Sequence, residues 1–85
     1  MELVRSRTFT KQYKKLPSKV QQQFKERLRL WSVTPNHPIL RVHPLKGKYN
    51  GYWSMSVIGD VRVIYYYRNE QVVVLALIGT HSQLC

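Results

Sequence analysis

The side chains of this sequence that can do acid–base or anion-binding chemistry are mainly histidine, arginine and lysine. The 85 residues include 14 lysines and arginines and 3 histidines, but only 4 aspartates and glutamates. So few carboxylates make a magnesium-dependent nuclease hard to assemble. Zinc-binding cysteine patterns, a P-loop, a dinucleotide fingerprint and paired carboxylates are absent from the sequence as well. The remaining residue types suffice to cleave RNA without a metal: a base deprotonates the 2′-OH, cations stabilise the phosphorane, and an acid protonates the leaving 5′-oxygen.

Two histidines are placed where they could share this acid–base work, because imidazole titrates near neutral pH. His43 precedes a predicted hairpin and His81 follows the last predicted strand, so both can lie at one edge of a sheet. From residue types alone, two such histidines are more often incidental than catalytic, and both interpretations stay open at this point. His37 lies between turn residues and is expected to be an exposed loop residue.

The hairpin predicted over Gly51–Arg68 is the element around which the rest of the chain is organised. It turns at Gly59 and Asp60, because glycine tolerates a positive φ and aspartate can hydrogen-bond its own backbone. Strand alternation separates an apolar face from a polar face. The predicted apolar face consists of Trp53, Met55, Val57, Val61, Val63 and Tyr65, and the opposite face of Tyr52, Ser54, Ser56, Arg62, Ile64 and Tyr66. A mid-strand guanidinium is costly to bury alone, so Arg62 either has a partner or faces a cleft, and we expect a cleft that receives phosphate.

A basic, irregular loop is predicted at residues 39–51, before the hairpin. It carries Arg41, Lys46 and Lys48 together with Tyr49, on whose ring a base can stack. This combination is typical of segments that hold single-stranded nucleic acid. The net charge of +10 also favours a polyanion, or an acidic protein that masks the charge, as the partner.

Two amphipathic helices and two further strands complete the predicted fold. Apolar residues at helical spacing predict one helix capped by Thr8 and a second over about Lys19–Trp31. The basic face of the second helix, which includes Arg27, is interpreted as solvated, with RNA contact as the alternative. Glu2–Arg5 is expected to be an edge strand and Gln71–Ile78 an interior strand. The expected architecture is α+β, one domain over residues 1–85 in the order β-α-α-β-β-β, with two N-terminal helices on a small, mainly antiparallel twisted sheet.

Targeting signals and cysteine usage favour the cytoplasm. The first residues lack the apolar stretch of a signal peptide, and no run approaches the length of a membrane span. Cys85 is the single cysteine and cannot form an internal disulfide, which fits a reducing compartment. We therefore expect a cytoplasmic protein without membrane contact.

Five short motifs follow one another in a characteristic order and spacing. They are Arg7–Tyr13, His43–Gly47, Gly51–Trp53, Ile58–Tyr65 and Gly79–Ser82, and together they extend over nearly the whole chain. The set resembles the RelE superfamily of bacterial toxins, and the His-Pro-Leu-Lys-Gly and Gly-Thr-His elements resemble its YafQ-like branch in particular. The resemblance implies a RelE-like fold and a ribosome-dependent mRNA endonuclease that inhibits translation. It also implies a cognate antitoxin that binds and silences the toxin.

The resemblance assigns roles by position. His43, Asp60 and His81 match active-site residues of the YafQ type, with Asp60 orienting a histidine or stabilising its cation. Arg62 matches the arginine that RelE-like toxins place after this Gly-Asp turn to hold the scissile phosphate.

Other positions either match more loosely or depart from the family pattern. Lys46 and Lys48 fall in the loop where RelE-like toxins carry functional basic residues. The departures are Ser54 and Ser56, where relatives often have arginine or histidine, Ile78, where arginine is usual, and Cys85, where an aromatic residue is common. Each cation missing from the cleft would weaken transition-state stabilisation by roughly tenfold or more.

We therefore expect the toxin of a type II toxin–antitoxin system that cleaves ribosome-bound mRNA without a metal or an organic cofactor. Its expected partners are the antitoxin, in a hetero-oligomer, and mRNA on the ribosome. The alternative is a catalytically weakened RelE-fold module that binds ribosomal RNA or an antitoxin without cutting. A further alternative is a regulatory partner in an operator-binding complex, in which the antitoxin supplies the DNA specificity.

Overall fold

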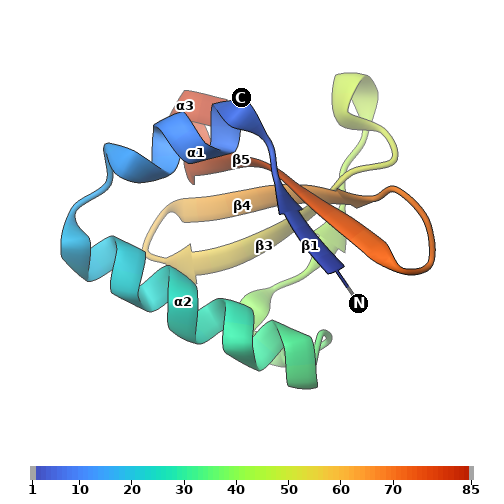
Figure 1. Cartoon of the computed structure of the whole chain (residues 1–85), viewed down its shortest axis with the longest axis horizontal. Coiled ribbons are helices and arrows are strands. Elements are labelled where there is room, and N and C mark those ends of the chain that lie inside the picture. Colours follow the sequence, from blue (N-terminus) through green and yellow to red (C-terminus); the bar gives the residue numbers. More distant parts are fainter. Residues whose placement is uncertain (1, 85) are drawn as a thin grey trace.

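The chain folds into a five-stranded sheet with strand order β1-β5-β4-β3-β2, to which three α-helices are added (Figure 1). This computed structural model describes residues 2–84, so the prediction for Cys85 lies outside the described residues. The elements are β1 (Glu2–Arg5), α1 (Arg7–Lys14), α2 (Ser18–Val33), the 3₁₀ helix η1 (Pro38–Leu40), β2 (His43–Pro44), the 3₁₀ helix η2 (Gly47–Tyr49), β3 (Trp53–Ile58), β4 (Val61–Tyr67), β5 (Val72–Thr80) and α3 (His81–Leu84). None of the helices within this described stretch has the length and apolar character that a membrane span requires.

The sheet confirms the predicted α+β class and its mainly antiparallel pairing. Strands β3, β4 and β5 form an antiparallel meander, β1 runs parallel to β5, and the two-residue β2 pairs antiparallel with β3. The interior position expected for Gln71–Ile78 is confirmed, because β5 lies between β1 and β4. The edge position of Glu2–Arg5 is confirmed as well.

The hairpin has the two faces that strand alternation predicts. Trp53 pairs with Tyr65 and Met55 with Val63, and these side chains point toward the helices. Phe9 of α1 and Phe24 of α2 pack there with ring centroids 5.6 Å apart. Together they exclude water from one face of the sheet, which is the main stabilising contribution in a small domain.

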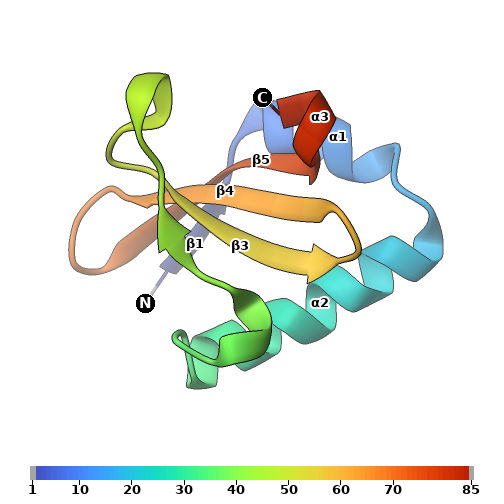
Figure 2. The same cartoon turned by 180° about the vertical axis from the view of Figure 1, so that it is seen from behind.

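The opposite face carries the predicted site residues of the hairpin. Viewed from behind in Figure 2, α3 and the segment that contains β2 lie in front of the sheet, whereas α1 lies beyond it. Helices α1 and α2 therefore cover one face of the sheet, and the short helix α3 and the segment that contains β2 cover the other in part.

A buried tyrosine and tryptophan connect α2 to the sheet. Trp31 Nε1 donates a hydrogen bond to Tyr65 Oη at 3.2 Å, and the two rings meet edge to face at 5.5 Å. Burial raises the pKa of Tyr65 to about 12, and the hydrogen bond from Trp31 only partly opposes this.

The turn at Gly59 and Asp60 forms as predicted, directly between the paired residues Ile58 and Val61. Gly59 has φ +55°, a conformation that glycine adopts without the Cβ penalty of other residues. The turn thus places Asp60 at the end of the sheet where β5 finishes.

The helix start predicted at Thr8 is wrong. Helix α1 begins at Arg7, and Ser6 is its N-cap, with Oγ accepting a hydrogen bond from Phe9 N at 2.9 Å. Ser6 Oγ also donates a hydrogen bond to Ala76 O of β5 at 2.7 Å. The pairing of β1 with β5 therefore places Ser6, and not Thr8, at the capping position. Helix α2 extends beyond the predicted Trp31 to Val33.

The predicted order β-α-α-β-β-β lacks two short elements, β2 and α3. A two-residue strand and a four-residue helix have little periodicity of their own, and neither would be stable in isolation. Both border the open face of the sheet and both carry a predicted site histidine.

Candidate active site

A cleft of about 380 Å³ on the open face brings together five of the predicted site residues. They are His43, Lys46, Tyr49, Arg62 and His81. The remaining lining residues are Leu45, Ser54, Ile64 and Leu84. These side chains come from β2 and the loop after it, the two hairpin strands, and α3, so the tertiary fold assembles the cleft.

Strand pairing explains why the central residues meet. His43 lies opposite Ser54 across β2 and β3, and Ser54 lies opposite Ile64 across β3 and β4. Directly opposed residues in an antiparallel pair have their Cβ atoms about 4.5–5.5 Å apart. One row of residues across the sheet therefore connects the first histidine with the strand that carries Arg62.

The tautomer of His43 follows from its hydrogen bond. Its Nδ1 lies 3.0 Å from the carbonyl oxygen of Arg41, which can only accept. In the neutral ring Nδ1 therefore carries the proton and Nε2 has the free lone pair. His43 is exposed, so this nitrogen is accessible to a ligand in the cleft.

His81 is positioned through its backbone. Its N–H is shared between the main-chain oxygen of Asp60 at 3.1 Å and Asp60 Oδ2 at 3.2 Å. Helix α3 is further held by Gln83, whose Oε1 accepts from Thr80 N at 2.9 Å, and by the buried Leu84. Asp60 does not line the cleft, and its carboxylate accepts a hydrogen bond from the main-chain N–H at the start of α3. Its predicted action on the imidazole of a histidine stays a prediction.

Arg62 is held in the cleft with part of its guanidinium unsatisfied. The side chain is half-buried, and Nε is fully buried without a hydrogen-bond partner among the described residues. An unpaired buried donor costs about 1–3 kcal/mol. Because Arg62 lines the cleft, an anionic oxygen bound there would meet the rest of the guanidinium rather than this buried nitrogen. The phosphate site expected from the sequence stays a prediction.

The basic loop is divided between the cleft and its surroundings. Lys46 lines the cleft, whereas Lys48 does not and instead has Nζ 5.3 Å from the centre of the Tyr49 ring. Tyr49 donates a hydrogen bond from Oη to Leu84 O at 3.4 Å, which closes the loop onto α3.

An aromatic row on the open face was not singled out as a functional group from the sequence. The ring centroids of Tyr49 and Tyr52 are 5.7 Å apart, and those of Tyr52 and Tyr66 are 5.1 Å apart. The alternation of the hairpin already placed Tyr52 and Tyr66 on this face, and that signal could have identified them as stacking residues beside Tyr49.

Arg41 does not line the cleft. It lies with Arg27 in a separate hollow of about 530 Å³ along β3. His37, expected in an exposed loop, is half-buried and caps η1, with Nδ1 accepting from Ile39 N at 3.1 Å.

The departure at Ile78 does not remove a group from the cleft. Residues Ile64 and Tyr65 of β4 pair with Leu77 and Leu75 of β5, so Ala76 is an extra residue that reverses the alternation. Ile78 therefore packs in the helix-covered core with 1% of its surface exposed. An arginine with the same backbone placement would point away from the cleft. Ser54, by contrast, does line the cleft and contributes no cation there.

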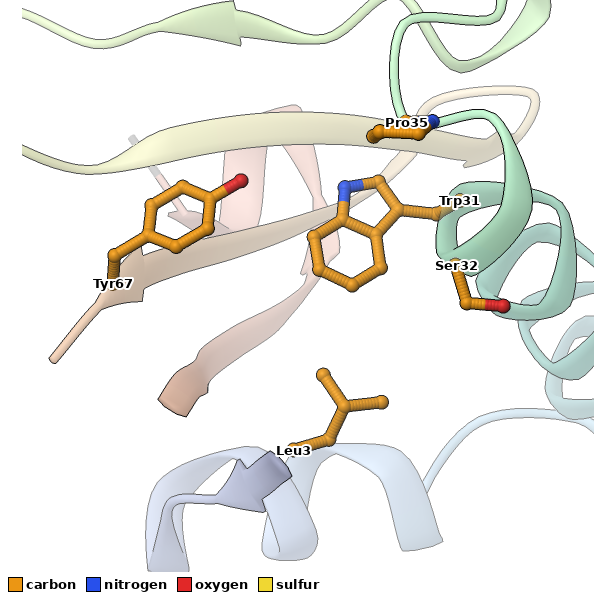
Figure 3. Close-up of a pocket in the computed structure, with 5 residues that line it drawn as sticks. All are labelled: Leu3, Trp31, Ser32, Pro35 and Tyr67. Atoms are coloured by element: carbon orange, nitrogen blue, oxygen red, sulfur yellow. The ribbon is translucent and has the colours of Figure 1, made fainter. Parts of the chain in front are cut away.

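A third hollow lies on the helix-covered side and is apolar (Figure 3). Its volume is about 160 Å³, and its lining consists of Leu3, Trp31, Ser32, Pro35 and Tyr67. In the figure the indole of Trp31 lies in the middle, with Tyr67 to its left, Pro35 above it and Leu3 below it. This hollow offers no imidazole, carboxylate or cation, so the open-face cleft is the candidate active site. Within residues 2–84 no cluster of three or more histidine, cysteine, aspartate or glutamate side chains is arranged to hold a metal ion.

Comparison with protein families identifies the class to which this fold and cleft belong. A family model described as "Bacterial toxin of type II toxin-antitoxin system, YafQ" matches residues 1–85. The chain therefore belongs to the YafQ family of type II toxins, which confirms the resemblance seen in the sequence motifs. No curated protein sequence matches the chain significantly.

Solved structures share the fold. YafQ from E. coli strain BL21(DE3) is 22% identical with a TM-score of 0.83, and the match covers 98% of this chain and 96% of that chain. A YoeB/ParE toxin from Agrobacterium tumefaciens is 21% identical with a TM-score of 0.79, covering 95% and 99%. A chain of the E. coli DinJ–YafQ toxin–antitoxin complex is 23% identical with a TM-score of 0.81, covering 98% and 94%.

Proposed function

We propose that this toxin is a ribosome-dependent mRNA endonuclease that cleaves with the RNA's own 2′-OH as nucleophile. The observation that supports this most directly is the presence of His43, Arg62 and His81 in one cleft. Two imidazoles and a guanidinium are the groups that metal-free transesterification requires. Membership of a toxin family makes mRNA on the ribosome a suitable target, and the basic composition suits an RNA partner.

The geometry of the cleft suggests how the work is divided. His43 has Nε2 free to take the proton from the 2′-OH, whose oxygen then attacks the adjacent phosphorus. His81 protonates the departing 5′-oxygen as the phosphorus–oxygen bond breaks, leaving a 2′,3′-cyclic phosphate and a 5′-OH. Arg62 stabilises the phosphorane, and Lys46 adds positive charge at the same cleft. Tyr49 and its aromatic neighbours offer surfaces on which the flanking bases stack.

We further propose that a cognate antitoxin binds this chain. The E. coli DinJ–YafQ complex, whose chain shares this fold, shows that a YafQ toxin can assemble with a protein partner. A net charge of +10 favours a partner with acidic residues. We expect the complex to be cytoplasmic, as the sequence indicates.

One observation favours the alternative of a module that binds without cutting. Ser54 is buried at the centre of the cleft, at a position where the sequence resemblance leads one to expect a cation. Binding to ribosomes with no cleavage by the wild-type chain would support this second candidate function.

The test is a cleavage assay on intact ribosomes programmed with a defined mRNA. Each of the substitutions His43→Ala and His81→Ala should lower the cleavage rate by roughly a hundredfold or more, the usual value of a positioned acid or base. The double variant should lose less than the product of the two effects, because the two groups act in one step. His37→Ala is the matched control, since this histidine caps η1 outside the cleft and should leave the rate unchanged.

The nucleophile is tested by replacing the single 2′-OH at the cut site with hydrogen. Cleavage should be abolished while ribosome binding persists. Cleavage of the deoxy substrate at the normal rate would mean that water attacks, and full activity of both histidine variants would refute the assigned roles.

A further inference from the structure

We propose that the hollow lined by Arg27 and Arg41 binds a second phosphate of the RNA strand whose scissile phosphate lies at Arg62. This inference rests on the proposed presence of RNA in the cleft. It assigns a binding role to Arg27, whose helix face was interpreted as solvated from the sequence.

The hollow is a basic recess along an uncovered stretch of β3. Its volume is about 530 Å³, and its lining is formed by Arg27, Pro38, Ile39, Arg41, Ser56, Val57, Ile58 and Gly59, without an acidic side chain. Strand β2 pairs only with Trp53 and Ser54, so the outer edge of β3 beyond them is not covered by another strand. Two arginines in one recess raise the local positive potential and attract an anion.

Arg27 is held in place before any ligand binds. Its Nε donates a hydrogen bond to the carbonyl oxygen of Val57 at 3.0 Å, where the register of β3 and β4 shifts. This bond uses one of the five guanidinium donors and leaves the four N–H groups of the terminal nitrogens. Because the side chain is half-buried and already oriented, binding a phosphate costs little further side-chain entropy.

Arg41 joins the hollow to the cleft. Its backbone has φ +49°, a left-handed conformation that costs a non-glycine residue about 1–2 kcal/mol. In this conformation its carbonyl oxygen receives the hydrogen bond from His43 Nδ1, while its side chain lines the hollow. One strained residue therefore orients the proposed base and contributes a cation to the neighbouring recess.

The sheet register places a residue of one recess beside a residue of the other. Ser56, which lines the hollow, lies directly opposite Arg62, which lines the cleft. A ligand that occupies both recesses must carry negative charges repeated along an extended chain, which is the chemistry of single-stranded RNA. A free anion could occupy only one of them.

The test measures binding rather than cleavage. Fluorescently labelled oligouridylates of about two and about eight nucleotides are titrated with the full chain at several salt concentrations. Arg27→Ala should weaken binding of the longer oligonucleotide by roughly three- to tenfold and reduce the slope of log affinity against log salt by about 0.7. The dinucleotide, which can fill only the cleft, should bind unchanged.

Two further variants control for charge and for folding. Arg29→Ala removes the same charge from an exposed position of the same helix that does not line the hollow, and it should change the slope far less. Arg27→Lys keeps the charge and should retain the slope, even where loss of the bond to Val57 lowers the unfolding temperature. The proposal would be overturned if Arg27→Ala and Arg29→Ala lowered the RNA affinity equally. It would also be overturned if Arg27→Ala lowered the affinity equally for the short and the long oligonucleotide.

The outcome is separable from that of the proposed function. Arg62→Ala should weaken binding of both oligonucleotides, because the cleft takes part in both complexes. Suppose that Arg27→Ala weakens binding of the longer oligonucleotide only, and that the wild-type chain does not cleave mRNA. This result would support phosphate binding in the hollow and would refute the proposed endonuclease activity. An Arg27→Ala variant that binds both RNAs normally but loses a co-expressed antitoxin would mean that the hollow serves a protein partner.

Discussion

The placement of Arg62 lowers the stability of the fold, and the phosphate-binding role that we propose for this residue would explain that cost. Its Nε is buried without a partner, and the neighbouring strand positions carry a serine and a glycine, Ser56 and Gly79. Neither residue accepts a hydrogen bond from this nitrogen, so the donor stays unsatisfied. Such local conflicts between stability and chemistry are expected at functional sites.

Tyr65 presents the opposite case, since its polar group serves stability. The phenol is buried, with 2% of its surface exposed, and it accepts the hydrogen bond from Trp31. Burial raises its pKa to about 12 from the usual 10.0, so between these values the folded chain keeps a proton that the unfolded chain releases. The contribution of the protonated Tyr65 phenol to the free energy of unfolding is therefore fully present below pH 10 and is lost as the pH rises toward 12.

We predict that Tyr65→Phe lowers the free energy of unfolding at neutral pH by about 1–3 kcal/mol, because Trp31 Nε1 loses its acceptor. Between about pH 10 and 12 the wild-type chain should lose roughly 2–3 kcal/mol more than the variant, since only the wild type has this phenol to ionise. Denaturant unfolding across this pH range measures both effects. Parallel curves for the two chains would contradict the assignment.

At the scale of elements, short segments position the site because longer elements hold them. Helix α3 has four residues and would not form alone. It is held by Asp60 at the β3–β4 turn, by Thr80 at the end of β5, and by Tyr49 of η2, which donates a hydrogen bond to Leu84 O. The position of His81 thus depends on the end of β5 directly before it and on two segments that are distant in the sequence, at Asp60 and Tyr49.

Ser6 is the corresponding junction for β1, α1 and β5. We predict that Ser6→Ala lowers the free energy of unfolding by about 1–2 kcal/mol, because it removes the cap of Phe9 N and the bond to Ala76 O. Thr8→Ala, at the position that the sequence suggested as the cap, should change stability by less than about 0.5 kcal/mol, as exposed substitutions usually do. Thermal or denaturant unfolding of the two variants decides between them, and a larger effect at Thr8 would contradict the structure.

At the scale of the whole molecule, the sheet separates two kinds of surface. The open face carries the cleft, the outer edge of β3 carries the basic hollow, and the helix-covered side carries the apolar hollow of Figure 3. Large apolar side chains are also exposed: Leu3, Val33, Ile39 and Tyr67. A protein partner therefore has both charge and apolar surface available.

We predict that the complex with the antitoxin survives roughly 0.5 M sodium chloride, where the screening length falls to about 4 Å. Apolar burial, which salt does not screen, should supply much of the binding free energy. Size-exclusion chromatography of the co-expressed pair at low and high salt measures this. Complete dissociation at high salt would indicate an association that is electrostatic alone.

The elements with a clear period could be predicted from the sequence. Alternation over the hairpin assigned Met55 and Val63 to the core and Arg62 to the open face, and the uniformly apolar run of β5 indicated an interior strand. These patterns are local consequences of side-chain direction, so they need no knowledge of the rest of the chain. Motif order likewise identified the family. Of the residues to which the resemblance gave roles, His43, Arg62 and His81 line the cleft, whereas Asp60 does not.

What the tertiary structure alone decided depends on contacts between distant residues. Ser6 becomes the N-cap of α1 because its hydroxyl also binds a carbonyl group of β5. The extra residue Ala76 in β5 turns the side chain of Ile78 into the core. The four-residue helix α3 forms only because it packs against the rest of the fold. The separation of Arg41 from the cleft, and its placement beside Arg27, likewise result from packing of η1 and α2 against β3. A periodic pattern of apolar residues does not encode such contacts. Each contact depends both on the local conformational preference of a residue and on where the fold places a distant segment.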